Sequence, residues 1–411
     1  MDVELQPTTE PGRAFVALAE QHATDFATRA AEHDREGSFP FENIAALQKS
    51  GFMAAPVPEE FGGMGLTSLY DTMVGVSRLA RGDASTAIAS NMHLASAAVM
   101  RRIWKHRNAE TPANVTGAIE GFMRAIGAGQ LIGCGPATEA GTDLSSPMTE
   151  LTPTEGGFLL NGHKIFGTLS PVAHVMFSTA RLKREDGSYD RALAVVPRGS
   201  SGMEIKDNWD ALGMRASGSG DVVYTDCFVP QAMALIEGGW GNLDADMALA
   251  PNAPLIACSL GIAEAARDIA VRGVTSLRKG ARGKLLAERI PIQQLVAEIE
   301  VDLATMRALI ERFGRLADEY LDRYGPNDDP QEARVILKEQ QCMKWVVNRK
   351  GIDVVDRALT LSGGAGYMSK HPLSRLYRDV RAGPFMQPFA PYEALEYIGK
   401  VTLGIDPPVD R

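Results

Sequence analysis

The sequence is poor in the features that mark several classes of protein. Its four cysteines are scattered along 411 residues and none belongs to a CxxC pair, so neither a zinc site nor a disulfide framework is indicated. No apolar run reaches the length of a membrane span, and the chain starts with polar residues instead of a secretion signal. We therefore expect no membrane association, no metal and a reducing, cytoplasmic location.

Positive charge is also scarce. The chain has 42 Lys and Arg residues against 51 Asp and Glu residues, a net charge of −9. Nucleic acids and anionic membranes bind basic surfaces, so neither is expected as a general partner. What the chain does have is an ordinary globular composition, 45% hydrophobic and 23% charged. At this length it is expected to divide into two or three domains.

Three successive regions differ in their hydrophobic pattern. Residues 13–125 have apolar positions at the three- and four-residue spacing of helices. From 131 to 230, short β-rich runs alternate with polar turns, which is typical of a small barrel or sandwich. The helical period returns from 244 to 404. The expected fold class is therefore α+β, with an N-terminal helical domain at 1–130, a central antiparallel β-barrel domain at 131–240 and a C-terminal helical bundle at 241–411.

Six sequence motifs follow one another over about 330 residues. They are PVPEEFGGMGL (56–66), LARGDAST (79–86), PATEAGTD (136–143), FLLNGHKIFGT (158–168), WDALGMRASGSGDVVYTDCFVP (209–230) and LSGGAGYMSKHPLSRLYRDVR (361–381). In this order they resemble the acyl-CoA dehydrogenase superfamily of flavin enzymes. The resemblance implies bound FAD, or FMN in a monooxygenase branch, and a homotetramer or homodimer. The long Ala- and Leu-rich helices of the last third also favour subunit packing.

The resemblance assigns three residues to the flavin ring. Thr138 matches the family's threonine at the pyrimidine edge, and Phe166 and Thr168 match the aromatic and hydroxyl residues beside the ring. These residue types suit a flavin, which needs hydrogen-bonding groups at one edge and an apolar wall over its face. The alternative is that they are ordinary strand residues.

Further residues are assigned to the rest of the cofactor. Gly363, Gly364, Gly366 and Tyr367 resemble the family's glycine-rich loop near the FAD pyrophosphate, often that of a neighbouring subunit. Glycines permit close backbone approach there, although a tight turn between helices would also use them. Arg278 is the candidate for the arginine that reaches FAD across the subunit interface, but the usual Arg-x-x-Phe-Gly spacing is absent.

The resemblance is less complete for the residues expected to bind the substrate. Arg215, Ser217 and Ser219 lie in the segment that lines the substrate entrance in such proteins, or else form a polar turn before a strand. The PATEAGTD loop, which helps to hold CoA in acyl-CoA dehydrogenases, is two residues shorter than usual. This shortening weakens the expectation that the chain binds CoA.

The usual catalytic base is missing. Dehydrogenation of an acyl thioester requires a carboxylate to take the α-proton while hydride goes to flavin N5. Counted from the Arg-Asp-Val-Arg motif, the family's Glu position holds Gln387, and a second known position for the base falls on Pro251 or Asn252. The nearest downstream carboxylates, Glu393 and Glu396, are expected on the following helix.

Three functions follow as hypotheses. The first is an acyl-CoA dehydrogenase-like enzyme that uses Glu393 or the substrate itself as base and passes electrons to an electron-transfer flavoprotein. The second is a two-component monooxygenase that takes reduced flavin from a reductase and hydroxylates a small or biosynthetic substrate with O₂. Relatives of that kind often have a histidine in the N-terminal helices, as His93 is here, and a His-Asp-Pro-like segment where this chain has Met386-Gln387-Pro388. The third is a catalytically silent flavin-binding subunit.

Overall fold

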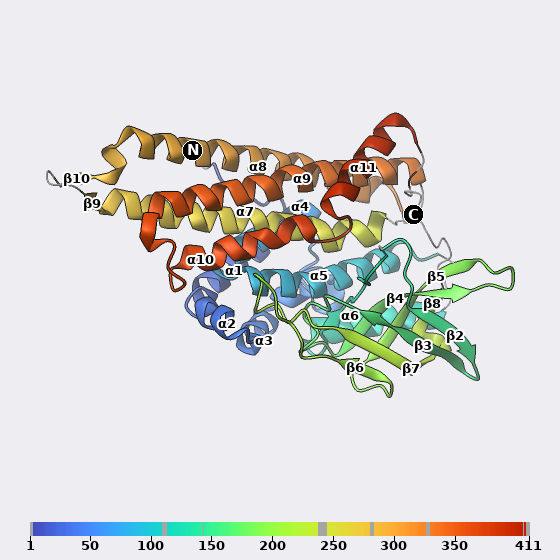
Figure 1. Ribbon diagram of the computed structural model, residues 1–411. Helices are drawn as coiled ribbons and strands as arrows, with labels where there is room; N and C mark the ends of the chain where they lie inside the picture. Colours follow the sequence, from blue (N-terminus) through green and yellow to red (C-terminus); the bar gives the residue numbers. More distant parts are fainter. Residues whose placement is uncertain are drawn as a thin grey trace.

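A computed structural model describes residues 3–108, 113–142, 144–236, 245–279, 283–325, 329–405 and 407. Its elements run in the expected order of helices, strands and helices (Figure 1). The N-terminal region contains α1 (Glu10–Phe26), α2 (Ala30–Glu36), α3 (Phe41–Lys49), α4 (Leu69–Gly82), α5 (Ala84–Lys105) and α6 (Ala113–Gly127). The division into three domains at residues 130 and 240 stays a prediction.

Capping and close packing fix the N-terminal helices. Asp83 ends α4 and caps α5, because its carboxylate accepts a hydrogen bond from the Ser85 N–H at 3.1 Å. Helices α1 and α4 approach so closely that a Cβ on Gly75 would lie 2.2 Å from the Phe15 ring. These contacts hold α5 in place, and α5 forms part of the cavity described below.

The β-region is an open sheet and not the expected barrel. The strand order is β6-β7-β3-β2-β4-β5-β8, with β1 beside β4, and the strands at the two ends of the path do not pair. Closure requires the end strands to pair along their length, and β6 and β8 have only three residues each. Most neighbouring strands are antiparallel, as expected, but β4 pairs in parallel with β1 and β2. The strands are β1 (Gly133–Cys134), β2 (Glu150–Thr154), β3 (Gly157–Lys164), β4 (Val175–Lys183), β5 (Tyr189–Pro197), β6 (Met203–Ile205), β7 (Val222–Pro230) and β8 (Ala234–Ile236).

Strand β4 is buried on both faces. Met176 and Ala180 pack against residues of β3, β5 and β7, whereas Val175 and Phe177 pack against residues of α5 and α6. Successive side chains of a strand point to opposite faces, which explains why the strand begins with three consecutive apolar residues, Val175 to Phe177. The sheet is thereby fixed to the N-terminal helices.

The C-terminal region is a bundle in which α7, α8 and α9 lie side by side (Figure 1). A short hairpin, β9–β10, connects α7 to α8. Helix α7 contains Pro251 and Pro254, so some carbonyls near its start lack the usual helical N–H partner. The elements are α7 (Ala245–Ser276), β9 (Arg278–Lys279), β10 (Lys284–Leu285), α8 (Ile290–Arg323), α9 (Pro330–Ser362), α10 (Pro372–Asp379) and α11 (Pro391–Leu403).

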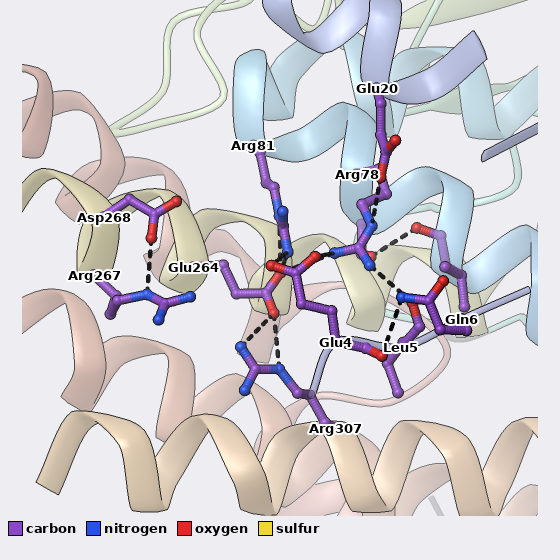
Figure 2. Close-up of polar contacts among 12 residues, drawn as sticks. Glu4, Leu5, Gln6, Glu20, Arg78, Arg81, Glu264, Arg267, Asp268 and Arg307 are labelled. Carbon is purple, nitrogen blue, oxygen red and sulfur yellow. Dashed lines mark hydrogen bonds and ion pairs between the residues drawn. The ribbon is translucent and has the colours of Figure 1, made fainter. Parts of the chain in front are cut away.

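A buried cluster of charged residues joins the bundle to the N-terminal region (Figure 2). Its centre is Glu264 of α7, 1% exposed, which binds Arg81 of α4 and accepts hydrogen bonds from Arg307 of α8 at 2.8 and 2.9 Å. Arg78 of α4 lies 3.7 Å from the same carboxylate. Glu4 adds a second carboxylate, 2.8 Å from Arg78 and 3.1 Å from Arg81. The cluster connects four parts of the chain that are far apart in sequence.

Further findings concern membrane-spanning helices, metal-binding groups and cysteines. Within the described ranges, no helix combines the length and apolar character needed to cross a bilayer. Across the same residues, His, Cys, Asp and Glu side chains form no group that could hold a metal ion. All four cysteines have free thiols.

Candidate functional site

A cavity of about 780 Å³ lies where the three regions of the chain meet. Its walls come from α5, α6, the strands β4, β5 and β8, and the start of α7. The segments 135–144, 166–168, 209–219, 232–233 and 378–387 also contribute lining residues. Most of the lining is apolar. The polar side chains in it are Ser96, Thr138, Thr168, Thr179, Arg191, Ser219, Asn252, Arg378, Arg381 and Gln387.

The cavity brings together five of the residues singled out from the sequence. Gln387 Nε2 donates a hydrogen bond to Thr138 Oγ1 at 3.1 Å, although the two residues are 249 positions apart. The Thr168 and Ser219 hydroxyls lie 2.8 Å apart, also at the cavity wall. Phe166 is the fifth. The motifs therefore converge on one site that combines hydroxyl groups, a carboxamide and an aromatic ring.

A strained corner presents Phe166 to the cavity. Directly after β3, Phe166 has φ of 55°, in the left-handed region that bulky residues rarely occupy. The corner is held by two backbone hydrogen bonds, one from the Ile165 N–H to Thr138 and one from the Gly167 N–H to Gly220. The Phe166 ring meets Trp209 edge to face at 5.9 Å, and both rings line the cavity. The corner and Trp209 together form an aromatic wall.

The segment that carries Trp209 packs tightly against the Arg-Asp-Val-Arg motif. A Cβ on Gly213 would lie 2.2 Å from the Arg378 carbonyl, so only glycine fits there. Asp379 accepts a hydrogen bond from the Met214 N–H at 2.7 Å, and its burial raises the pKa of that carboxyl to about 6. Two motifs that the sequence shows separately thus form one wall.

Two of the three residues predicted at the substrate entrance lie outside the cavity lining. The Arg215 guanidinium donates to the Asp34 carbonyl at 2.8 Å and to the Asp210 carboxylate at 2.9 Å. The Ser217 hydroxyl lies 2.6 Å from that of Ser219, which does line the cavity. Only Ser219 of this group reaches the site directly.

The two ionisable candidates for catalysis also lie outside the lining. Glu393 is near the start of α11, where its carboxylate accepts a hydrogen bond from the Ala390 N–H at 2.9 Å. His93 is fully buried in α5, and its Nδ1 accepts a hydrogen bond from the Gly133 N–H at 3.0 Å. Burial lowers the pKa of His93 to about 4, so its imidazole is neutral at physiological pH. This histidine fixes β1 against α5.

Replacing His93 by Gln is expected to weaken the acid dependence of stability. In the unfolded chain a histidine takes up a proton near its ordinary pKa of 6.5, whereas the folded protein keeps it neutral down to about 4. Its stabilising contribution is therefore complete above pH 6.5 and is lost as pH falls toward 4. Between pH 7 and pH 4.5 the free energy of unfolding should therefore fall by about 2–3 kcal/mol more in the wild type than in His93→Gln. Denaturant titrations at pH 7 and 4.5 measure this, with the exposed His163→Gln as control; equal losses in all three proteins would contradict it.

Arg278 and the glycine-rich loop lie far from the cavity within one chain. Both are at the end of the bundle remote from the sheet (Figure 1). Arg278 donates to the Gly283 carbonyl at 2.9 Å within the β9–β10 hairpin. Gly363 has φ of 58°, open space surrounds it and Gly364, and Tyr367 is 90% exposed. Their assignment to the cofactor of a neighbouring subunit stays a prediction.

Several site residues were not predicted from the sequence. Trp209, Arg378 and Arg381 line the cavity and lie within two of the six motifs, so their position was a usable signal. Asn252 also lines the cavity, although it was noted only as a position where a base is missing. Lys344 of α9, 3% exposed, binds the Met386 carbonyl and donates to the Phe389 carbonyl at 2.5 Å. It holds the segment that carries Gln387.

The motif glutamate Glu139 also has a structural role. Its carboxylate accepts hydrogen bonds from the N–H groups of Met148, at 2.8 Å, and Thr149, at 3.1 Å, and binds the fully buried Lys164 of β3. Burial lowers the pKa of this lysine to about 8, and the carboxylate opposes that shift. The ion pair fixes the segment after Thr138 to the sheet.

Comparison with known families defines the class of protein. Residues 9–111, 137–227 and 239–387 match the N-terminal, middle and C-terminal domains of acyl-CoA dehydrogenase, respectively. The chain belongs to the acyl-CoA dehydrogenase family, as the six motifs predicted.

Individual relatives have more specific names. The chain is 38% identical to L-evernosamine nitrososynthase of Micromonospora sp., over 97% of this chain and 92% of that protein. It is 34% identical to amino sugar nitrososynthase DnmZ of Streptomyces peucetius, over 97% and 95%. The solved structure of KijD3 in complex with FMN and dTDP-3-amino-2,3,6-trideoxy-4-keto-3-methyl-D-glucose superposes with a TM-score of 0.90, at 33% identity, and covers 99% of this chain and 98% of that one.

Proposed function

We propose that this protein is a flavin-dependent monooxygenase that oxidises the amino group of a nucleotide-linked amino sugar. The observation that carries the proposal is the absence of any Asp, Glu or His among the described residues that line the cavity. Removal of an α-proton from an acyl thioester needs such a base. Oxygen transfer to an amine does not, because the amine nitrogen supplies its own electron pair.

The names of the relatives support the same reaction. Two are nitrososynthases, one of L-evernosamine and one of amino sugars, and KijD3 was solved with FMN and an amino sugar nucleotide. Of the three hypotheses from the sequence, the monooxygenase therefore has more support than the acyl-CoA dehydrogenase. The enzymatic names also weigh against a silent subunit.

The cavity suits a flavin. Its volume of about 780 Å³ lies in the range of about 300–1,000 Å³ usual for ligand pockets. The aromatic wall of Phe166 and Trp209 would cover the flat ring, and the hydroxyls of Thr138 and Thr168 would hydrogen-bond at its edge. The Gln387 contact fixes Thr138 in place for that purpose.

The first oxidation can be written as a balanced reaction. The amine, O₂, two electrons and two protons give the hydroxylamine and water. An N–O bond forms and the O–O bond breaks, so that one oxygen atom goes to nitrogen and the other to water. A bound reduced flavin supplies the two electrons and activates O₂. We propose a flavin reductase as the partner that provides it, and a homo-oligomer as the assembled form.

The test compares two substrate classes on the same preparation. The protein is loaded with FMN or FAD, reduced, and mixed with isotopically labelled O₂ and the amino sugar nucleotide found in the KijD3 structure. We expect one labelled oxygen atom in a hydroxylamine or nitroso product, measured by mass spectrometry. No oxygen transfer to the amine, with normal flavin binding, would contradict the proposal.

The second arm tests dehydrogenation. The oxidised flavoprotein is mixed without oxygen with a panel of acyl-CoA thioesters while flavin absorbance is followed. We expect no bleaching, because Gln387 cannot accept the α-proton. Bleaching by any thioester would show that the dehydrogenase reaction takes place and would overturn the proposed function.

A further inference from the structure

A smaller cavity adjoins the main one. Its volume is about 180 Å³, below the range of about 300–1,000 Å³ that is usual for a whole ligand. Its lining residues come from α9, from the segment after α10 and from the start of α11. Arg381 and Phe385 line both cavities, so a ligand in the main cavity can extend into the smaller one. Its size and place are those of a subsite for one group of a larger ligand.

The charged side chains of the smaller cavity are all positive. They are Lys344, Arg349 and Arg381. Lys344 is already bound to two backbone carbonyls. Arg349 and Arg381 have no carboxylate within ion-pair distance in the part of the chain that the structure describes, unlike Arg378, which binds Asp34. Two positive charges without a carboxylate partner, in the lining of one small cavity, favour an anionic ligand.

The Arg349 side chain is held by an aromatic ring. Its guanidinium lies 4.0 Å from the centroid of the Trp345 ring, one turn earlier on α9, and both residues line the smaller cavity. Stacking of this kind uses the flat face of the guanidinium and leaves the N–H groups at its edge for a ligand. Two parallel N–H donors match two oxygens of one phosphate group.

Asn348 contributes a buried donor without an acceptor. At 1% exposed it is the least exposed residue of the lining. Its Oδ1 accepts a hydrogen bond from the Ser259 hydroxyl at 2.7 Å, which leaves the amide nitrogen as the other end of the side chain. Nδ2 has no hydrogen-bond partner among the described residues. Since buried donors are almost always paired, this atom indicates an acceptor that binds at the smaller cavity.

We infer that this cavity, the phosphate pocket, uses Arg349, Arg381 and Asn348 to bind a phosphate group of a ligand whose larger part lies in the main cavity. A phosphate monoester offers three acceptor oxygens and about two negative charges at pH 7, which suits donors and positive charges alone. The choice of phosphate over another anion rests on the proposed function, because flavin mononucleotide and a nucleotide-linked sugar both carry phosphate. The experiment has one arm for each of these two sources.

The first arm measures what the phosphate of a flavin contributes to binding. The flavin-free protein is titrated with FMN and with riboflavin, which lacks the phosphate, and both dissociation constants are obtained from flavin fluorescence. If the phosphate pocket binds this phosphate, the ratio of the riboflavin to the FMN constant should fall about 10-fold or more in Arg349→Met and in Arg381→Met. The ratio does not change when a variant weakens both ligands equally.

The second arm measures the phosphates of a nucleotide. The oxidised, FMN-loaded protein is titrated calorimetrically with dTDP and with thymidine. An equal fall in the ratio of the thymidine to the dTDP constant would assign the phosphate pocket to the nucleotide. Arg349→Met decides the result, because Arg349 lines the smaller cavity alone, whereas Arg381 lines both. Wild-type values of both ratios in Arg349→Met would overturn the inference and leave a pair of solvated arginines only.

Two further variants test the charge and its position. Arg349→Lys keeps the charge but loses the paired donors, so its ratio should lie between those of the wild type and Arg349→Met. Arg124 of α6 is the matched control, because its guanidinium also stacks on a ring, 4.7 Å from the centroid of Phe61, and it lines neither cavity. Arg124→Met should leave both ratios unchanged. A fall equal to that of Arg349→Met would show a general effect of charge and would overturn the inference.

The two proposals fail in different ways. Both ratios are measured without oxidation of an amine. If the wild type transfers no oxygen to the amine while Arg349→Met lowers one of the ratios, the proposed function fails and the phosphate pocket stands. If the amine is oxidised and neither ratio changes in Arg349→Met, this inference alone fails.

Discussion

Glu264→Gln should lower the free energy of unfolding by about 3–5 kcal/mol, the range for removal of one partner from a buried ion pair. Glu264 is 1% exposed and is the common partner of Arg81, Arg307 and Arg78. The glutamine keeps the shape but removes the negative charge, so the buried Arg307 loses the carboxylate that it binds. Arg78 and Arg81 keep the more exposed Glu4. Denaturant and thermal unfolding at pH 7 measure the loss.

The control is a charge change at the edge of the same cluster. Glu20 contacts Arg78 at 3.2 Å but is 57% exposed, so Glu20→Gln should cost about 1 kcal/mol or less. A double variant sharpens the test, because Arg307→Met removes part of the excess positive charge. Its combination with Glu264→Gln should cost less than the sum of the single changes. Additive losses, or a loss below 1 kcal/mol for Glu264→Gln alone, would contradict the electrostatic explanation.

The order of the structural regions was predictable because it follows from local periodicity. Helical spacing over 13–125 and 244–404 corresponds to the observed α1–α6 and α7–α11. The β-rich stretch at 131–230 contains β1–β7, and β8 follows it at Ala234–Ile236. Closure of the sheet was not predictable in this way. It depends on which strands pair, and the residues of β4 are compatible with parallel as well as antiparallel partners.

Cavity residues could be predicted where they were assigned by the resemblance to a known family. Thr138, Phe166, Thr168, Ser219 and Gln387 come from segments far apart in sequence, and their resemblance to one family was enough to bring them together. Polar residue type alone was a poor guide. Arg215 and His93 have the right chemistry for a site, but their hydrogen bonds go to Asp34, Asp210 and Gly133 outside it.

The burial of Lys344 and its contacts with backbone carbonyls could not be predicted from the sequence. Its partners are the carbonyls of Met386 and Phe389, 42 and 45 positions away, and backbone carbonyls have no residue-specific pattern. A lysine inside a long helix is usually taken as exposed, whereas this one is 3% exposed. Its burial became visible only when α9 and the segment before α11 were placed together.

Lys344→Met should reduce the kcat of amine oxidation about 100-fold, because small displacements of a binding group are costly to this extent. The variant leaves the two carbonyls around Gln387 without their charged donor, at about 1–3 kcal/mol for each one that stays buried. The segment 386–389 should therefore move, and Gln387 with it. Hydrogen exchange of its amides should become faster, a change that is measured without any substrate.

The pH dependence separates this positioning role from a general loss of stability. Burial lowers the pKa of Lys344 to about 8, an effect that Glu393 opposes. The charged donor is therefore present below pH 8 and is lost above it, so wild-type kcat should decline above about pH 8. Lys344→Met should lack that decline and show its loss mainly in kcat and not in KM. Lys338→Met, on the same helix but paired with Glu339 at 2.7 Å, should retain both the activity and the alkaline limb. Two results would contradict this role: wild-type rates of amide hydrogen exchange in segment 386–389 of Lys344→Met, and a decline of its kcat above pH 8 like that of the wild type. Lys344 would then have no part in holding Gln387 at the cavity.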